Sequence, residues 1–244
     1  MQEIDIEIKG ENGERKEEII IKDNQQQIVG AIIIAGILIA GAILLKGSRP
    51  IDDAPVTNNN KNISWQGRPV TSSDHIKGNR NAKIIIVEYS DLECPFCQVF
   101  HNTMHQVVNG NNQVAWVYRH YPIPKHTKAF KEAEATECAW GQGGNDAFWK
   151  YTDRLFEVTP SNNGLDVAEL PKIAQYIGLN VTSFNTCLAS GKFKVKIQAD
   201  VDDGNKAGVN GTPSSFILVK DKVVDTIRGA QPFEVVMQQI NQIK

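Results

Sequence analysis

Residues Lys83 to His101 read KIIIVEYSDLECPFCQVFH, and this stretch decides the fold of the domain that contains it. The β-branched run from Ile84 to Val87 predicts a buried strand. Residues 90–91 predict a turn, and Pro95 then suits the first position of a helix, where its missing N–H is no loss. The stretch therefore predicts a strand, a tight turn and a helix that begins beside Cys94.

The predicted helix start gives its two cysteines different chemistry. Cys94 is expected at the N-cap, where it faces free backbone N–H groups and the positive end of the helix dipole. A thiolate is stabilised there, so Cys94 should have a lowered pKa and be the exposed nucleophile. Cys97 lies nearly one turn deeper, where its sulfur can reach Cys94 and should be more buried. The pair is therefore predicted to cycle between a dithiol and a disulfide.

A single CxxC motif is also half of a zinc site, which usually takes four ligands from two such pairs. The sequence has no second CxxC, but His101 and His105 follow Cys97 at helical spacing and leave a Cys/Cys/His site as one alternative. An inert structural pair is another. The redox interpretation is favoured, and with it we expect no metal and no cofactor.

Two further features favour redox chemistry. Glu88 lies in the apolar strand six residues before Cys94, where a carboxylate could relay a proton for Cys97. A strand-end residue that points to water is the alternative for this glutamate. Far downstream, residues 211–219 read GTPSSFILV. A proline just before a buried strand is unfavourable in a ladder, so a cis peptide bond before Pro213 is predicted.

The strand, the CPFC motif and the Gly-Thr-Pro loop before a second strand together resemble the thioredoxin superfamily, specifically its DsbA-like thiol–disulfide oxidoreductases. The resemblance covers residues 70–244 and implies an α/β thioredoxin-like fold with a helical insertion. It also implies that Pro95 and Phe96 bind substrate together with the loop residues Thr212 and Pro213. Typical DsbA enzymes have CPHC, so Phe96 stands in place of a histidine whose imidazolium would add to the local field.

The resemblance also gives expectations outside these motifs. It matches Glu88 to the buried acid behind the active site. Cys138 and Cys187 lie on two different predicted helices, and similar sequences carry a like pair, so a structural disulfide is expected between them. Two buried free thiols are the alternative. His126 matches a histidine often seen in similar sequences, but a plain surface residue is the preferred interpretation.

The activity implied by the resemblance is thiol–disulfide exchange. We expect an oxidase that introduces disulfides into extracytoplasmic proteins through Cys94 and Cys97. Its partners would be protein thiol or disulfide substrates and a membrane redox partner that reoxidises the pair. A disulfide reductase or isomerase is one alternative, although the extra dimerisation domain of the family's isomerases is not visible in the sequence. A client-binding, chaperone-like module with a non-cycling disulfide belongs to a different class.

Composition agrees with one globular domain and an appendage. The chain has 244 residues, of which 41% are hydrophobic and 22% charged, and its net charge of −2 gives no reason to expect nucleic acid as a partner. Residues 1–27 carry eight acidic and four basic side chains. With no core of their own, they are predicted to form a short polar tail without fixed structure.

Residues 28–45 read IVGAIIIAGILIAGAILL and contain no charge. As a helix they would extend roughly 27 Å, about the thickness of the hydrocarbon layer of a membrane. The run has no polar face, so a transmembrane anchor is predicted, with a cleaved signal peptide as the alternative. Flanking basic residues are balanced, so orientation is assigned from chemistry, because oxidising disulfide exchange belongs outside the cytosol. We predict a single-pass protein of the cell membrane, with residues 1–27 in the cytoplasm and the catalytic domain outside.

The remaining segments complete the predicted domain. Residues 46–64 predict a flexible tether, and residues 65–244 the DsbA-like domain, with a helical insertion over about 128–206. The helix from Pro95 is expected to run to about Val108 and to end at Gly110, and the next strand to cover residues 114–121. Strands over 215–219 and 223–228 and a last helix over 232–243 are expected to follow the insertion.

The insertion shows four amphipathic runs and no strand signal. Asp166 and Thr182 are predicted to lie in the N-terminal turns of helices and Gly178 to end one. Large aromatic side chains recur along these runs and are expected to form the core of the insertion, namely Trp140, Phe148, Trp149, Tyr151 and Phe156.

Overall fold

A computed structural model describes residues 65–243 of the chain. The predicted tail 1–27, anchor 28–45 and tether 46–64 lie outside the described residues and stay predictions. Between residues 65 and 243, no helix has both the length and the apolar character needed to cross a membrane.

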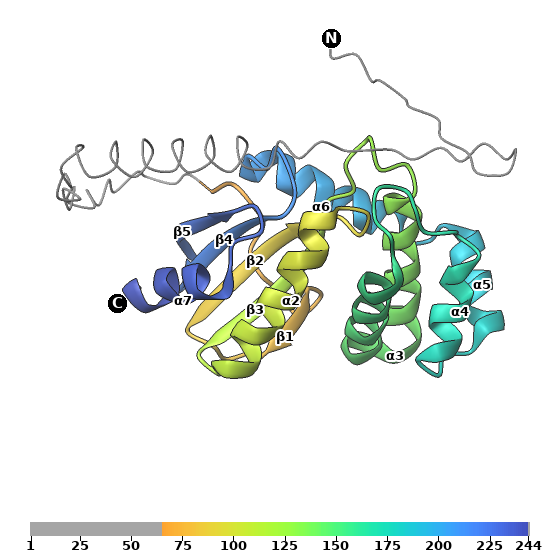
Figure 1. The fold of residues 1–244 in the computed structure, drawn as a ribbon, viewed down its shortest axis with the longest axis horizontal. Coiled ribbons are helices and arrows are strands. Elements are labelled where there is room, and N and C mark those ends of the chain that lie inside the picture. The colour runs from red at the N-terminus through yellow and green to blue at the C-terminus, as the bar shows by residue number, and fades with distance from the viewer. Residues whose placement is uncertain (1–64, 244) are drawn as a thin grey trace, which may run out of the picture. The chain divides into compact units, whose positions relative to one another are not determined.

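A five-stranded mixed sheet forms the centre of the described domain, with the strand order β1-β3-β2-β4-β5 (Figure 1). Strand β2 pairs in parallel with β3 and antiparallel with β4, while β1 and β5 pair antiparallel at the two edges. The strands cover β1 His75–Gly78, β2 Ile84–Ser90, β3 Val114–His120, β4 Ser214–Val219 and β5 Lys222–Arg228. Strands β3 to β5 confirm the predicted ones to within one residue at each end. Strand β2 begins at Ile84 as predicted but continues three residues past Val87, to Ser90.

Strand β1 was not predicted. It has only four residues, HIKG, and two of them, His75 and Lys77, give it no apolar alternation. Its place in the sheet comes from pairing with β3, in which His75 lies opposite Tyr118 and Gly78 opposite Ala115. A strand fixed by its partner leaves little trace in its own sequence.

Helices α2 (Pro95–Gly110) and α7 (Phe233–Gln242) cover one face of the sheet. Helix α2 presents Phe100, Met104 and Val107 at positions i, i+4 and i+7, and all three are fully buried. Figure 1 shows α2 lying across the sheet with its N-terminal end near the end of β2. The predicted helix from Pro95 is confirmed, including its end at Gly110.

Alternation along β2 separates two cores. Ile86 packs in the cluster that contains α2 and α7, whereas Val87 packs on the opposite face with Phe216 and the end of α6 (Lys194–Ala207). The strand is therefore covered on both faces, as its unbroken apolar run Ile84–Val87 predicts. Glu88 follows within this buried strand.

Four helices occupy the stretch between β3 and β4, which confirms the predicted helical insertion: α3 Ala129–Val158, α4 Glu169–Tyr176, α5 Val181–Ser190 and α6. Figure 1 shows α3, α4 and α5 grouped beside the sheet rather than on it. Helix α3 joins two of the predicted amphipathic runs and bends at Gly143 and Gly144, which leave helical geometry. The φ of Gly144 is 65°, a conformation that favours glycine.

Two of the helix boundaries in the insertion agree with the sequence and one differs. Gly178 follows α4 with φ 83°, as expected of a helix stop, and Thr182 lies in the first turn of α5, as predicted. Asp166 instead lies two residues before the N-cap of α4, Ala168, and its carboxylate accepts a hydrogen bond from the Ala168 N–H. The cap of α5 is Asn180, whose side chain accepts a hydrogen bond from the Ser183 N–H.

The aromatic side chains of α3 pack as expected, but they also join the insertion to the sheet. Phe148 and Trp149 are buried, and Trp149 lies with its ring 4.5 Å from that of Trp116 on β3. Phe148 meets Tyr118 of the same strand at 5.6 Å. Tyr151 and Phe156 are buried as well, and Trp140 is partly buried. The insertion and the sheet therefore share one core.

Candidate active site

The start of α2 places Cys94 at the end of β2, as the sequence predicts. Cys94 is the N-cap residue, with extended backbone angles of φ −86° and ψ 119°, and Pro95 occupies the first turn. The Cys94 carbonyl accepts a hydrogen bond from Gln98 N–H at 3.1 Å, which closes that turn. The Cys94 thiol is therefore held beside the unpaired N–H groups of a helix start.

The two thiols have different surroundings. Cys97 is fully buried, and the exposed fraction of Cys94 is only 5%, so the prediction of an exposed nucleophile is wrong in degree although Cys94 is the more accessible of the two. The cause is the loop before β4, whose residue Thr212 has its carbonyl oxygen 3.5 Å from the Cys94 sulfur. The Cys94 sulfur is therefore largely covered by this loop.

The local charges and hydrogen bonds shift the pKa values of the two thiols in opposite directions. A hydrogen bond from the Cys97 thiol lowers the pKa of Cys94 to about 6 against the opposing effect of burial, and Thr212 and the N–H groups of Cys97 and Phe96 lower it as well. Burial raises the pKa of Cys97 far above its usual range, and the negative charges of Cys94 and Glu88 raise it further. At neutral pH the arrangement holds a thiolate on Cys94 and a thiol on Cys97.

Glu88 is a fully buried carboxyl in the centre of the sheet. It lies opposite Tyr118 of β3 and Ser215 of β4 in the strand register. The alternative of a strand-end residue pointing to water is therefore wrong. Burial raises the pKa of Glu88 to about 7, so this group exchanges protons near neutral pH, and its charge acts on the pKa of Cys97.

The loop before β4 has the geometry predicted for it. The peptide bond between Thr212 and Pro213 is cis. A hollow of about 410 Å³ lies along residues 207–216 and 226–229, with Thr212 and Pro213 in its wall. Phe96 and Val99 on the first turns of α2 are 63% and 58% exposed. The cysteine pair is thus bordered by the loop that carries the cis peptide bond and by exposed apolar side chains.

The second cysteine pair forms a disulfide in the structure. Cys138 of α3 and Cys187 of α5 have their Cα atoms 5.8 Å apart and are separated by 49 residues. Cys138 is buried in the hydrophobic core that the insertion shares with the sheet, and Cys187 is partly buried against it. The bridge joins two helices of the insertion, whereas the Cys94–Cys97 pair lies at the start of the single helix α2.

Sequence reasoning missed a carboxylate–imidazole pair beside Cys97. The Asp91 N–H lies 3.4 Å from the Cys97 sulfur, and the Asp91 carboxylate lies 2.9 Å from Nδ1 of His126 and accepts a hydrogen bond from Ile123 N–H. The prediction of a surface His126 is wrong, since only 4% of it is exposed. No local signal identifies this contact, because the two residues are 35 positions apart.

The structure does not bring His101 and His105 together with Cys94 and Cys97, as the alternative of a Cys/Cys/His metal site requires. His101 and His105 lie on the face of α2 that meets α3, where their ring nitrogens converge on Asp153. In the described part of the chain, the groups of side chains that could hold a metal ion include neither Cys94 nor Cys97.

Known proteins resemble this chain in sequence and in structure. A family model described as thioredoxin matches residues 71–240, more than half of the chain. DsbA2 of Pseudomonas aeruginosa is 27% identical, with a TM-score of 0.61 over 72% of this chain and 97% of that one. BdbD of Bacillus subtilis, in its oxidised form, is 24% identical, with a TM-score of 0.60 over 72% of this chain and 95% of that one.

Curated relatives share only one part of their length with this chain. A protein named Na(+)/H(+) antiporter NhaA 1 from Salinispora arenicola is 34% identical over 145 residues, which are 59% of this chain and 21% of that protein. Its namesake from Mycolicibacterium vanbaalenii is 30% identical over 155 residues, 62% of this chain and 24% of that protein. This chain spans less than a quarter of the length of either relative. The family match and the architecture agree: the chain belongs to the thioredoxin family, and the fold that carries its Cys94–Cys97 pair is of the DsbA type.

Proposed function

We propose that this protein is a thiol–disulfide oxidoreductase, and specifically an oxidase that introduces disulfides into extracytoplasmic proteins. The observation that carries the proposal is the pairing of a low-pKa thiol with a buried one at a single helix start. The pKa of Cys94 is lowered to about 6 and that of Cys97 is raised. A sulfur that is stable as a thiolate is a good leaving group, and it favours the reduced form of the pair, as an oxidant requires.

The reaction balances within the two cysteines and two substrate thiols. In the oxidised protein a substrate thiolate attacks the Cys94 sulfur, the Cys94–Cys97 bond breaks, and its electron pair leaves on Cys97. Glu88, with its pKa raised to about 7, supplies a proton to the Cys97 sulfur. A second substrate thiolate then attacks the substrate sulfur of the mixed disulfide, and Cys94 leaves as a thiolate. The substrate loses two electrons and the cysteine pair gains them.

Substrate is held by the surfaces that border Cys94. An extended segment placed in the hollow of about 410 Å³ would lie along Thr212 and Pro213. The exposed side chain of Phe96 offers an apolar contact next to the reacting sulfur. Neither contact selects a particular side chain, so we propose a broad range of unfolded protein thiols as substrates.

Continued turnover requires an electron acceptor for the reduced pair, and we propose a membrane redox partner for this step. The charge-free run of residues 28–45 supports a membrane anchor, with the catalytic domain outside the cytoplasm. Labelling of intact cells with a membrane-impermeant thiol reagent tests the location. Cys94 of the reduced protein should be labelled without lysis, and labelling only after lysis would contradict the proposed orientation.

The reduction potential of Cys94–Cys97 tests the direction of the reaction. Equilibration with glutathione should give a value closer to that of DsbA, roughly −120 mV, than to that of thioredoxin, roughly −270 mV. The oxidised protein should also form disulfides in a reduced multi-cysteine substrate. A potential near that of thioredoxin would instead assign a reductase, and client binding that survives replacement of both cysteines by serine, without exchange activity, would assign a chaperone-like module.

A further inference from the structure

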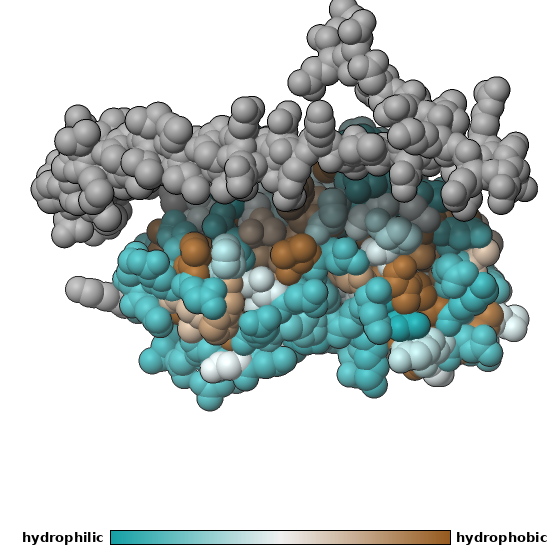
Figure 2. Space-filling model, in the orientation of Figure 1, coloured by the Kyte–Doolittle hydropathy of each residue, from teal (hydrophilic) through white to brown (hydrophobic). Residues whose placement is uncertain are grey.

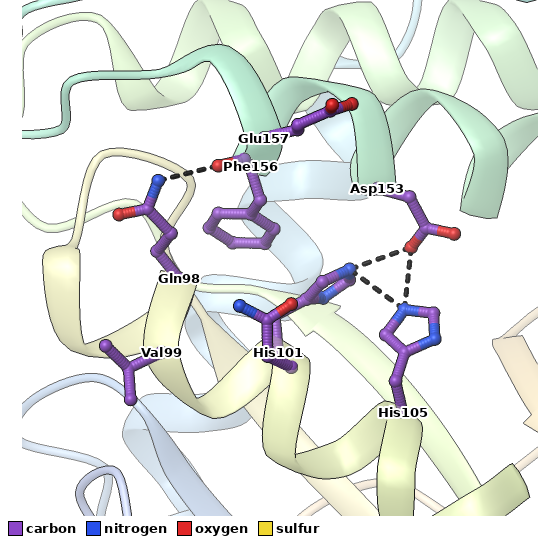
Figure 3. Close-up of a pocket in the computed structure, with 8 residues that line it drawn as sticks. Gln98, Val99, His101, His105, Asp153, Phe156 and Glu157 are labelled. Atoms are coloured by element: carbon purple, nitrogen blue, oxygen red, sulfur yellow. Dashed lines mark hydrogen bonds and ion pairs between the residues drawn. The ribbon is translucent and has the colours of Figure 1, made fainter.

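A cluster of two imidazoles and one carboxylate lies between α2 and α3, apart from the cysteine pair. His101 and His105 are one helical turn apart on α2, and Asp153 comes from α3. Figure 3 shows both rings turned toward the same carboxylate oxygen. We propose that these three side chains bind one Zn²⁺ ion, with a fourth position open to solvent or to an added ligand.

The three candidate ligand atoms lie at nearly the separations of a metal site. Nε2 of His101 and Nε2 of His105 are each 2.8 Å from Oδ1 of Asp153 and 3.1 Å from each other. A tetrahedral ion with bonds of about 2.0 Å separates its ligands by about 3.3 Å. Outward shifts of a few tenths of an ångström therefore make room for the ion.

Hydrogen bonding alone satisfies this geometry poorly. If both rings donate to the carboxylate, the two nitrogens that face each other at 3.1 Å both carry protons and neither can accept. An ion among the three atoms takes the place of the protons on the two Nε2 atoms. Each nitrogen and Oδ1 of Asp153 then donates a lone pair to the ion. Imidazole and carboxylate are also ligands that Zn²⁺ commonly takes, and three protein ligands with a fourth position for water are the set found in catalytic zinc sites.

The sequence spacing agrees with this assignment. His101 and His105 stand at i and i+4, the separation by which two histidines of one helix bind zinc in metalloproteases. In those proteins the residue after the first histidine is a glutamate that acts as a base, and here it is Asn102. The proposed ion therefore lacks a neighbouring base for hydrolysis on this helix and is assigned a binding role.

The cluster is open to solvent. It lies in a surface pocket of about 530 Å³ that is also lined by Gln98, Asn102 and Glu157. The His105 and Asp153 side chains are 23% and 37% exposed, so an ion can enter without unfolding the domain. The Lys77 ammonium lies 3.3 Å from Oδ2, the other oxygen of Asp153, which leaves Oδ1 to face the rings.

A second histidine cluster supplies an internal contrast. His75, His120 and Glu137 also converge, but all three are buried. Oε1 of Glu137, the atom that faces both rings, already lies 2.6 Å from the Lys196 ammonium. A cation thus occupies the position that an ion would take, and we assign no metal to this cluster.

The test measures binding of Co²⁺, a spectroscopic substitute for Zn²⁺, to the full-length chain. Cys94 and Cys97 are first oxidised to their disulfide so that no free thiolate competes for the metal. We expect one equivalent of Co²⁺ with the visible absorption of a four- or five-coordinate ion, displaced by Zn²⁺. Fluorescence of Trp116, whose ring lies 5.1 Å from that of His101, should fall as Co²⁺ binds.

Matched variants separate this site from adventitious binding. Asp153→Asn and His105→Gln, both at partly exposed positions, should weaken Co²⁺ binding by more than about 100-fold, since losing even an outer-shell partner costs about 10- to 100-fold. Glu157→Gln removes a carboxylate from the same pocket and should leave binding unchanged. Absence of a stoichiometric site in the wild-type chain, or equal binding by Asp153→Asn, overturns the proposal. Circular dichroism of each variant confirms that it is folded.

Discussion

The two cysteine pairs of this protein differ in every property that decides whether a disulfide opens. Cys94 and Cys97 share one turn of α2, whereas Cys138 and Cys187 are 49 residues apart on different helices. The first pair lies at a helix N-terminus and has one low-pKa thiol. The second pair joins α3 to α5. Both pairs lie in the same hydrophobic core, so the electrostatics at the start of α2, and not burial, set the first pair apart. The bond that must open lies within one helix turn, and the bond that must stay closed joins separate elements.

Replacement of single cysteines should give the largest difference between the pairs. Cys94→Ala is expected to lower the rate of disulfide transfer by more than about 1,000-fold, because the remaining thiol of the pair, Cys97, is fully buried and has a raised pKa. The double variant Cys138→Ala/Cys187→Ala should retain transfer, measured at a temperature where it is folded. Substantial transfer by Cys94→Ala, measured with a reduced multi-cysteine substrate, would show that the two pairs do not divide their roles in this way.

The same double variant should lose stability. The Cys138–Cys187 bridge closes a loop of 49 residues, and the chain-entropy model gives about 4 kcal/mol for a loop of that size. Urea denaturation of the wild-type and double-variant chains measures the difference in free energy of unfolding. A loss below about 1 kcal/mol would mean that helix packing, not the bridge, holds α3 to α5.

Glu88→Gln is expected to act on one cysteine pair only. Without a proton donor next to Cys97, the first transfer step should slow by about 100-fold at neutral pH. The part of the pH–rate profile that reports the group with a pKa of about 7 should disappear with it. Stopped-flow mixing with a thiol substrate gives both readouts, and Glu157→Gln is the surface control. An unchanged profile would leave Glu88 as a buried residue without a role in proton transfer.

The smallest expected effect is a pH-dependent stability confined to the Cys94–Cys97 pair. The pKa of Cys94 is lowered to about 6 in the folded chain from about 9. Ionisation of Cys94 therefore contributes stability that is present at high pH and lost as pH falls through 6. Relative to the oxidised form, the reduced form should gain about 1.4 kcal/mol between pH 5 and pH 7, equivalent to about 30 mV.

Paired denaturation curves at the two pH values measure this gain, with the Cys138–Cys187 bridge intact in all samples. Cys97, with its raised pKa, stays protonated over this range and does not contribute. A difference that does not change with pH would show that Cys94 is not a thiolate at pH 7. The oxidised chain is its own control, since its Cys94 sulfur does not titrate.

Much of the fold follows from local patterns, and the exceptions share one cause. The run Ile84–Val87 and the Pro95 helix start fix β2 and α2, and the packing of α2 follows from the spacing of Phe100, Met104 and Val107. Strand β1 was missed because its pairing with β3, and not its own residues, decides it. Sequence patterns predict elements whose stability lies in their own residues.

The same distinction holds at the candidate site. Cys94, Cys97 and the cis bond before Pro213 were identified from short motifs. The partner of His126 and the third member of the His101–His105 cluster come from distant positions, 35 and 48 or more residues away. Such contacts exist only once the sheet and the insertion are placed. The degree to which Thr212 covers Cys94 likewise depends on a loop more than 100 residues downstream.

The connectivity of the cysteines has a consequence for how the chain is made. In order of synthesis the sulfurs appear as Cys94, Cys97, Cys138 and Cys187, and the two pairs of this structure each join neighbours in that order. At translation rates of about 5–20 residues per second, Cys187 follows Cys138 by a few seconds to about ten. A chain oxidised as it emerges reaches its native pairing if Cys94 and Cys97 close first, and no reshuffling is needed to correct it.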